Sequence, residues 1–116
     1  MIQEGSYAGL LTRLAGGGAL LLYVSTADCA VCAAVRPRVE ALVGRLAFPA
    51  VEVSTSAVPE AAGQLGLFTA PAVLLFYAGR EYHRQARFLD FDALEKRMRE
   101  IMRMEAEQGL SAAERT

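Results

Sequence analysis

Two cysteines, Cys29 and Cys32, are separated by two residues, and the chain contains no others. A thiolate attacks a disulfide, and a second thiol close by attacks the mixed disulfide that results, so this spacing suits thiol–disulfide exchange. Cysteine pairs also bind metals, and buried cysteines serve as small apolar residues. The pair alone therefore leaves three interpretations open: redox chemistry, half of a metal or iron–sulfur site, or two inert core thiols.

The context of the pair favours redox chemistry. It follows a continuous apolar run at 19–25, which predicts a buried strand, and it opens an apolar stripe of helical period at 29–47. The first turn of a helix favours a thiolate, because its backbone N–H groups are unpaired and the helix dipole is positive there. We therefore expect Cys29 to be the exposed nucleophile and Cys32 the more buried resolving thiol. Structural zinc takes four ligands, so one chain that offers this pair and a distant His83 cannot complete a site, although two chains could share one.

The rest of the chain alternates predicted helices and strands. Apolar residues at helical spacing predict helices over 2–15 and from the N-cap Asp90 to about Glu107, and Pro59 with Gly66 predicts a short helix over 59–65. Apolar runs predict strands at 50–54 and 72–77, and a tight turn at 78–80 predicts a further strand at 81–87, antiparallel because of the short connection. This order implies an α/β fold with a central mixed four-stranded sheet, helices on both faces and an extra N-terminal helix. We expect a single domain over residues 1–116, with its core at about 19–106 and a frayed tail at 108–116.

Composition narrows the possible partners. The 12 Lys and Arg residues nearly balance the 13 Asp and Glu residues, which disfavours binding to nucleic acid or to an anionic membrane surface. The longest apolar stretch, 19–24, is too short to cross a bilayer, and the N-terminus lacks the basic and apolar regions of a secretory signal. We therefore expect a cytoplasmic protein, and a monomer in preference to an oligomer.

Two prolines extend the pattern around the cysteines. Pro37 lies five residues after Cys32, and Pro71 lies 39 residues after it, just before a predicted strand. In this combination residues 19–104 resemble the thioredoxin family. The resemblance implies a thioredoxin fold, a cis peptide bond before Pro71, and binding of the substrate backbone by Thr69, Ala70 and Pro71. It also implies disulfide exchange with a protein substrate and with a reductase through a Cys29–Cys32 disulfide, with no metal or other cofactor.

Three positions depart from the pattern of that family. Asp28 stands where the family usually has tryptophan; its charge would oppose a Cys29 thiolate, unless Asp28 is only the N-cap of the helix. Tyr23 stands where the family buries an aspartate thought to assist proton transfer, and Glu52 stands where that aspartate has a lysine partner. Tyrosine is a poor base at neutral pH. Either Tyr23 and Glu52 hydrogen-bond, with Glu52 as the proton acceptor, or Tyr23 is a core residue and Glu52 faces solvent.

These departures keep a second function open. Our leading hypothesis is a thiol–disulfide oxidoreductase with a dedicated partner. In it, Asp28, Tyr23 and Glu52 modulate the pKa values of the active-site cysteines. The alternative is a non-catalytic thioredoxin-fold interaction or redox-regulatory module that docks a specific partner. Asp28 and the missing buried aspartate favour the alternative, whereas the retention of both cysteines and of Pro71 disfavours it.

Overall fold

The computed structural model describes the backbone of residues 1–114 and the side chains of residues 1–109. Its strands are β1 (Ile2–Gln3), β2 (Leu20–Ser25), β3 (Ala50–Ser54), β4 (Ala72–Tyr77) and β5 (Arg80–Ala86). Its helices are α1 (Tyr7–Ala15), α2 (Ala30–Leu46), α3 (Pro59–Leu65) and α4 (Phe91–Glu114). Most of these bounds lie within two residues of those that the apolar patterns predict.

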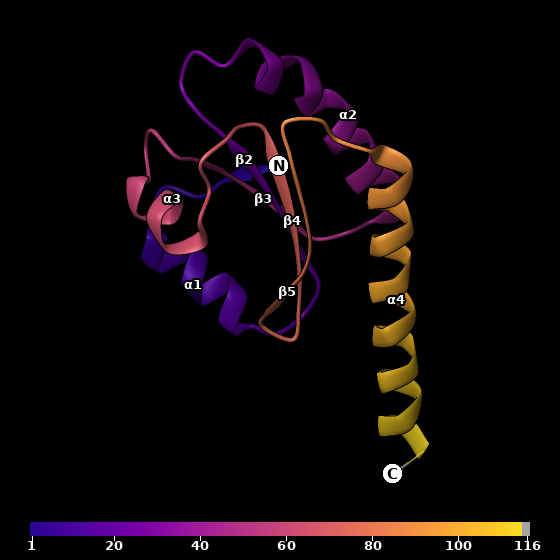
Figure 1. Cartoon of the computed structure of the whole chain (residues 1–116). Helices are drawn as coiled ribbons and strands as arrows, with labels where there is room; N and C mark the ends of the chain where they lie inside the picture. Colours follow the sequence, from indigo (N-terminus) through magenta and orange to yellow (C-terminus); the bar gives the residue numbers. More distant parts are fainter. Residues whose placement is uncertain (115–116) are drawn as a thin grey trace.

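The strands form one mixed sheet in the order β1-β3-β2-β4-β5. β2 pairs in parallel with β3 and antiparallel with β4, and β5 pairs antiparallel with β4. In Figure 1, α1 and α3 lie on one side of the sheet, while α2 and α4 lie on the other. The expected α/β architecture with helices on both faces is therefore confirmed.

Each face of the sheet has its own apolar core. Leu22 and Leu74 point to the face that α1 and α3 cover, where Leu10 and Ala61 pack against them. Alternate residues of the same strands point to the other face, where Val39, Leu42, Leu94 and Met98 of α2 and α4 pack on them. A strand buried on both faces reads as a continuous apolar run, which is why residues 19–25 carry no polar alternation.

The N-terminal segment differs from its prediction. The sequence pattern predicted a helix from residue 2, whereas Ile2–Gln3 form β1, a fifth strand that pairs in parallel with β3. The helix begins only at Tyr7, because the Ser6 side chain caps it by accepting the Gly9 N–H at 3.0 Å. The expected four-stranded sheet is therefore extended by one strand at the β3 edge.

The C-terminal helix is longer than predicted. The Asp90 side chain accepts the Ala93 N–H at 3.0 Å, as expected for an N-cap, and α4 then continues to Glu114 instead of ending near Glu107. The Tyr77 hydroxyl donates to Gln108 Oε1 at 2.6 Å, which ties the first residue of the expected tail to the end of β4. Residues 115–116, the last two of that expected tail, lie outside the described residues.

Candidate active site

The two cysteines form a disulfide at the start of α2, with their Cα atoms 5.2 Å apart. Cys29 is the N-cap residue, and its Sγ accepts the backbone N–H of Cys32 at 3.1 Å. Cys29 is half-buried, whereas Cys32 is only 1% exposed. The helix N-terminus thus directs an amide N–H at the more accessible sulfur, which favours negative charge there when the disulfide is reduced.

Asp28 lies immediately before this cap and is exposed to solvent. Because Cys29 occupies the N-cap position, the interpretation of Asp28 as the cap is wrong. Its backbone has a φ of 57°, a left-handed conformation that aspartate adopts more readily than most residues. The Ser56 hydroxyl accepts the Ala27 N–H at 2.9 Å, and this contact holds the loop between β2 and α2.

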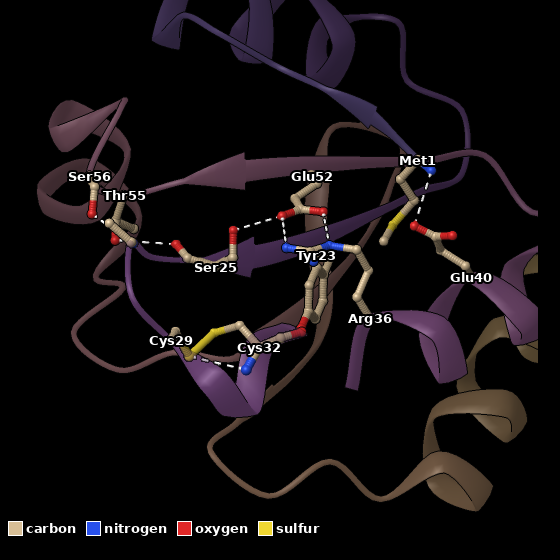
Figure 2. A network of polar contacts seen from close by, with 11 residues as sticks. Met1, Tyr23, Ser25, Cys29, Cys32, Arg36, Glu40, Glu52, Thr55 and Ser56 are labelled. Atoms are coloured by element: carbon tan, nitrogen blue, oxygen red, sulfur yellow. Dashed lines mark hydrogen bonds and ion pairs between the residues drawn. A yellow bond between two sulfur atoms is a disulfide. The ribbon is translucent and has the colours of Figure 1, made fainter. Parts of the chain in front are cut away.

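Tyr23 lies beneath the second cysteine. Its fully buried hydroxyl donates to the backbone carbonyl of Cys32 at 2.6 Å (Figure 2). Tyr23 and Glu52 are paired residues of β2 and β3, but the predicted alternative of a hydrogen bond between them is wrong, since the Tyr23 hydroxyl goes to Cys32. The other alternative is confirmed in its placement of Tyr23 in the core. Burial raises the pKa of Tyr23, so its hydroxyl is a protonated donor at neutral pH and not a base.

Glu52 is 2% exposed, so the prediction that it faces solvent is wrong. Arg36 of α2 donates Nε–H to Oε1 and Nη2–H to Oε2, both at 2.8 Å, and Ser25 Oγ–H donates to Oε2 at 2.8 Å (Figure 2). Burial alone would raise the pKa of Glu52, but the hydrogen bonds from Arg36, Ser25 and Gln3 lower it below its usual value. Glu52 is therefore an ionised, fully paired carboxylate.

Sequence reasoning did not identify Arg36 and Ser25 as members of this cluster. One signal was available for Arg36. It lies four positions after Cys32 and therefore on the same face of the predicted helix as Cys32. No comparable signal marked Ser25, whose role depends on the pairing of β2 with β3. We call Tyr23, Ser25, Arg36 and Glu52 the polar cluster.

The segment before β4 comes to the same end of the sheet as the disulfide. The Ala70–Pro71 peptide bond is cis, as the resemblance implied, and Ala72 pairs with Val24 near the end of β2. The loop from β2 to Cys29 begins two residues further on, so Pro71 stands beside the start of that loop. Thr69 and Ala70 are half-buried, and among the described residues their backbone groups form no hydrogen bond to another backbone group.

Metal ligands do not gather anywhere else in the described part of the chain. Within residues 1–109, whose side chains the structure describes, no three His, Cys, Asp or Glu side chains lie close enough together to hold an ion. None of the described helices has both the length and the apolar character needed to cross a bilayer. The candidate reactive groups of the site are the two sulfurs of the Cys29–Cys32 disulfide.

Comparison with known proteins assigns the family. No family model matches the chain. The thioredoxin-like protein YdfQ of Bacillus subtilis is 35% identical over 86 residues, which cover 72% of this chain and 75% of YdfQ. The chain belongs to the thioredoxin-like proteins.

Solved structures agree with this assignment at the level of the fold. The thioredoxin of Fasciola hepatica matches with a TM-score of 0.76 at 20% identity, covering 85% of this chain and 98% of its own. The Schistosoma mansoni thioredoxin matches with a TM-score of 0.78 at 14% identity, covering 86% of this chain and 96% of its own. A thioredoxin fold that carries a disulfide between cysteines of C-x-x-C spacing supports a thiol–disulfide oxidoreductase.

Proposed function

We propose that this protein exchanges disulfides with a dedicated protein partner, with Cys29 as the nucleophile and Cys32 as the resolving thiol. The observation that carries the proposal is the asymmetry of the disulfide. The half-buried sulfur accepts an amide N–H at the start of a helix, and the other sulfur is buried beneath it. An accessible, stabilised thiolate attacks first, and a shielded thiol reacts only with the sulfur beside it.

The reductive direction proceeds in two exchanges. The Cys29 thiolate attacks one sulfur of the substrate disulfide, forms a mixed disulfide and releases the other substrate sulfur as a thiolate. The Cys32 thiolate then attacks Cys29 Sγ, releases the second substrate sulfur and leaves the Cys29–Cys32 disulfide. The substrate gains two electrons, the two protons of the protein thiols pass to the substrate sulfurs, and a dithiol reductase must return the protein to its reduced form.

The surrounding residues have distinct roles in this proposal. The backbone of Thr69, Ala70 and Pro71 receives an extended substrate segment. Tyr23 is a positioning residue, because its hydroxyl holds the carbonyl of Cys32 and so supports the first turn of α2. The exchange uses no cofactor beyond the two sulfurs, and we extend the proposal to a monomer that acts in the cytoplasm.

The Cys29→Ser variant tests the proposal. Wild-type protein reduced with dithiothreitol should reduce the interchain disulfides of insulin, and Cys29→Ser should abolish this turnover. Cys32→Ser is the matched control, since it keeps the nucleophile, also stops turnover, and should accumulate a mixed disulfide that mass spectrometry detects. Wild-type protein that fails to reduce insulin or any other protein disulfide would favour the docking module as the function.

A further inference from the structure

Arg84 of β5 connects the sheet to the end of α3. Its side chain lies on the face of the sheet that α3 covers, because Arg84 pairs with Leu74, whose side chain points to that face (Figure 1). There the guanidinium donates Nη2–H to the Leu65 carbonyl at 2.7 Å and Nη1–H to the Gly66 carbonyl at 3.0 Å. The last carbonyls of a helix have no partner within the helix, and a cation is favoured beside them. Arg84 therefore caps the C-terminus of α3 from a strand of the sheet.

A β-bulge in β5 gives Arg84 a partner of its own. The pairing of β4 with β5 shifts between Leu75 and Phe76, which leaves Tyr82 as an extra residue without a partner on β4. Residues three apart on a regular strand point to opposite faces, whereas this bulge turns Glu81 and Arg84 to the same face. The Glu81 carboxylate accepts Nε–H at 3.1 Å and Nη2–H at 2.6 Å from Arg84. The guanidinium is thus fixed by Glu81 on one side and by α3 on the other.

The segment that follows Gly66 leads directly into the candidate active site. It runs through Thr69 and Ala70 to Pro71, beside the loop that precedes α2. Its far end is also held by β5 and the residue after it, because the Arg87 backbone N–H donates to the Pro71 carbonyl at 2.8 Å. Between these two anchors, Thr69 and Ala70 form no hydrogen bond to another backbone group among the described residues. The segment is therefore fixed at both ends, and its middle is free to pair with an extended chain.

We propose that Arg84 is a positioning residue for substrate binding. By fixing the end of α3, it holds Thr69 and Ala70 beside the disulfide, so that their backbone groups meet the substrate segment without a prior rearrangement. The hydrogen bonds of the Arg84 side chain go to Glu81 and to α3, and none goes to either cysteine. Arg84 therefore affects how firmly a polypeptide binds and leaves the reactivity of the thiolate unchanged. This inference rests on the proposed function and identifies a residue that serves it from outside the site.

Steady-state reduction of insulin by the wild type and by Arg84→Ala tests the inference. The variant should raise the KM for insulin about three- to tenfold, the contribution of one backbone hydrogen bond, and leave kcat within about twofold. Its rate with bis(hydroxyethyl) disulfide should not change, because that small compound has no peptide backbone to bind. Arg84→Lys keeps a donor for the carbonyls of α3 and should recover part of the lost affinity. Arg97→Ala is the matched control, since it loses an ion pair of the same i,i+3 spacing and similar exposure on α4 and should leave the KM unchanged.

An unchanged KM for insulin in Arg84→Ala would overturn the inference, as would an equal loss of rate with both disulfides, which would place the effect on the cysteines. A binding measurement separates this result from failure of the proposed function. NMR titration of the oxidised protein with insulin B chain whose cysteines are alkylated requires no disulfide exchange. Weaker binding by Arg84→Ala than by wild type and Arg97→Ala, with shifts at the Thr69 and Ala70 amides, supports the inference even if insulin is not reduced. Equal binding by the three proteins excludes it.

Discussion

On the buried side of the disulfide, Ser25 and Arg36 pair with Glu52, and the Tyr23 hydroxyl bonds to the backbone of α2. No buried side-chain polar atom among the described residues lacks a partner. At the end of the sheet that carries the disulfide, by contrast, Phe68 and Phe88 lie almost fully in solvent. The polar groups on the buried side of the disulfide are satisfied within the chain, whereas the exposed side leaves apolar surface open to solvent. We therefore expect changes beneath Cys32 to alter stability, and changes around Cys29 to alter the choice of substrate.

Glu52→Ala should have the largest effect on stability. It leaves the Ser25 hydroxyl buried without its acceptor and Arg36 without its counter-ion. The Arg36 side chain is 34% exposed and can turn to water, so we expect a loss of about 2–3 kcal/mol in the free energy of unfolding. Urea denaturation of the oxidised protein measures this loss in the free energy of unfolding. Glu107→Ala, at an exposed glutamate of α4, is the control and should change the same quantity by less than about 0.5 kcal/mol.

Acid should weaken the polar cluster for the same reason. The pKa of Glu52 is lower in the folded protein than its ordinary value of 4.5, so its ionised form stabilises the fold. That contribution is complete above about pH 4.5 and is lost as the pH falls through the lower folded value. Between pH 6 and pH 3, the free energy of unfolding should therefore decline more in wild type than in Glu52→Gln. Equal declines in the two proteins would show that Glu52 is not ionised in the cluster.

Tyr23→Phe should have a smaller effect, because it removes one hydrogen bond and keeps the ring. We expect a loss of about 1 kcal/mol in the free energy of unfolding, since the Cys32 carbonyl loses its hydroxyl donor. The pH dependence of closure of the Cys29–Cys32 disulfide, followed by rapid alkylation, should keep its shape between pH 6 and pH 9. A change of shape in that range would contradict the assignment of Tyr23 as a protonated positioning residue and would make it a proton acceptor.

Phe68→Ser and Phe88→Ser should have the smallest effect on stability, at less than about 0.5 kcal/mol each, because neither ring is buried. Thermal unfolding followed by circular dichroism measures this change. An unchanged melting temperature would sharpen the contrast between the two regions. A clear drop in melting temperature would show that the rings stabilise the fold and would contradict the contrast.

Much of the fold could be predicted from local patterns. The bounds of β3, α3 and β4 agree with their predictions, because apolar runs, Pro59 and the glycine after Leu65 are local signals. The first strand could not be predicted, since a two-residue strand carries no periodicity and forms only by pairing with β3. Glu52 was misplaced for a related reason, because a glutamate in a predicted strand ordinarily faces water unless a distant residue pairs with it.

The sequence by itself determined the order of helices and strands, the position of the cysteine pair at the start of a helix, and the resemblance around Pro71. These features depend on residues close together in the chain, whose spacing is readable without the fold. Only the tertiary structure decided that Arg36 pairs with Glu52, 16 residues away, and that the Tyr23 hydroxyl reaches Cys32 instead of Glu52. It also decided that the segment after β5 lies beside Pro71, because strand pairing and the Arg87–Pro71 hydrogen bond bring the two segments together.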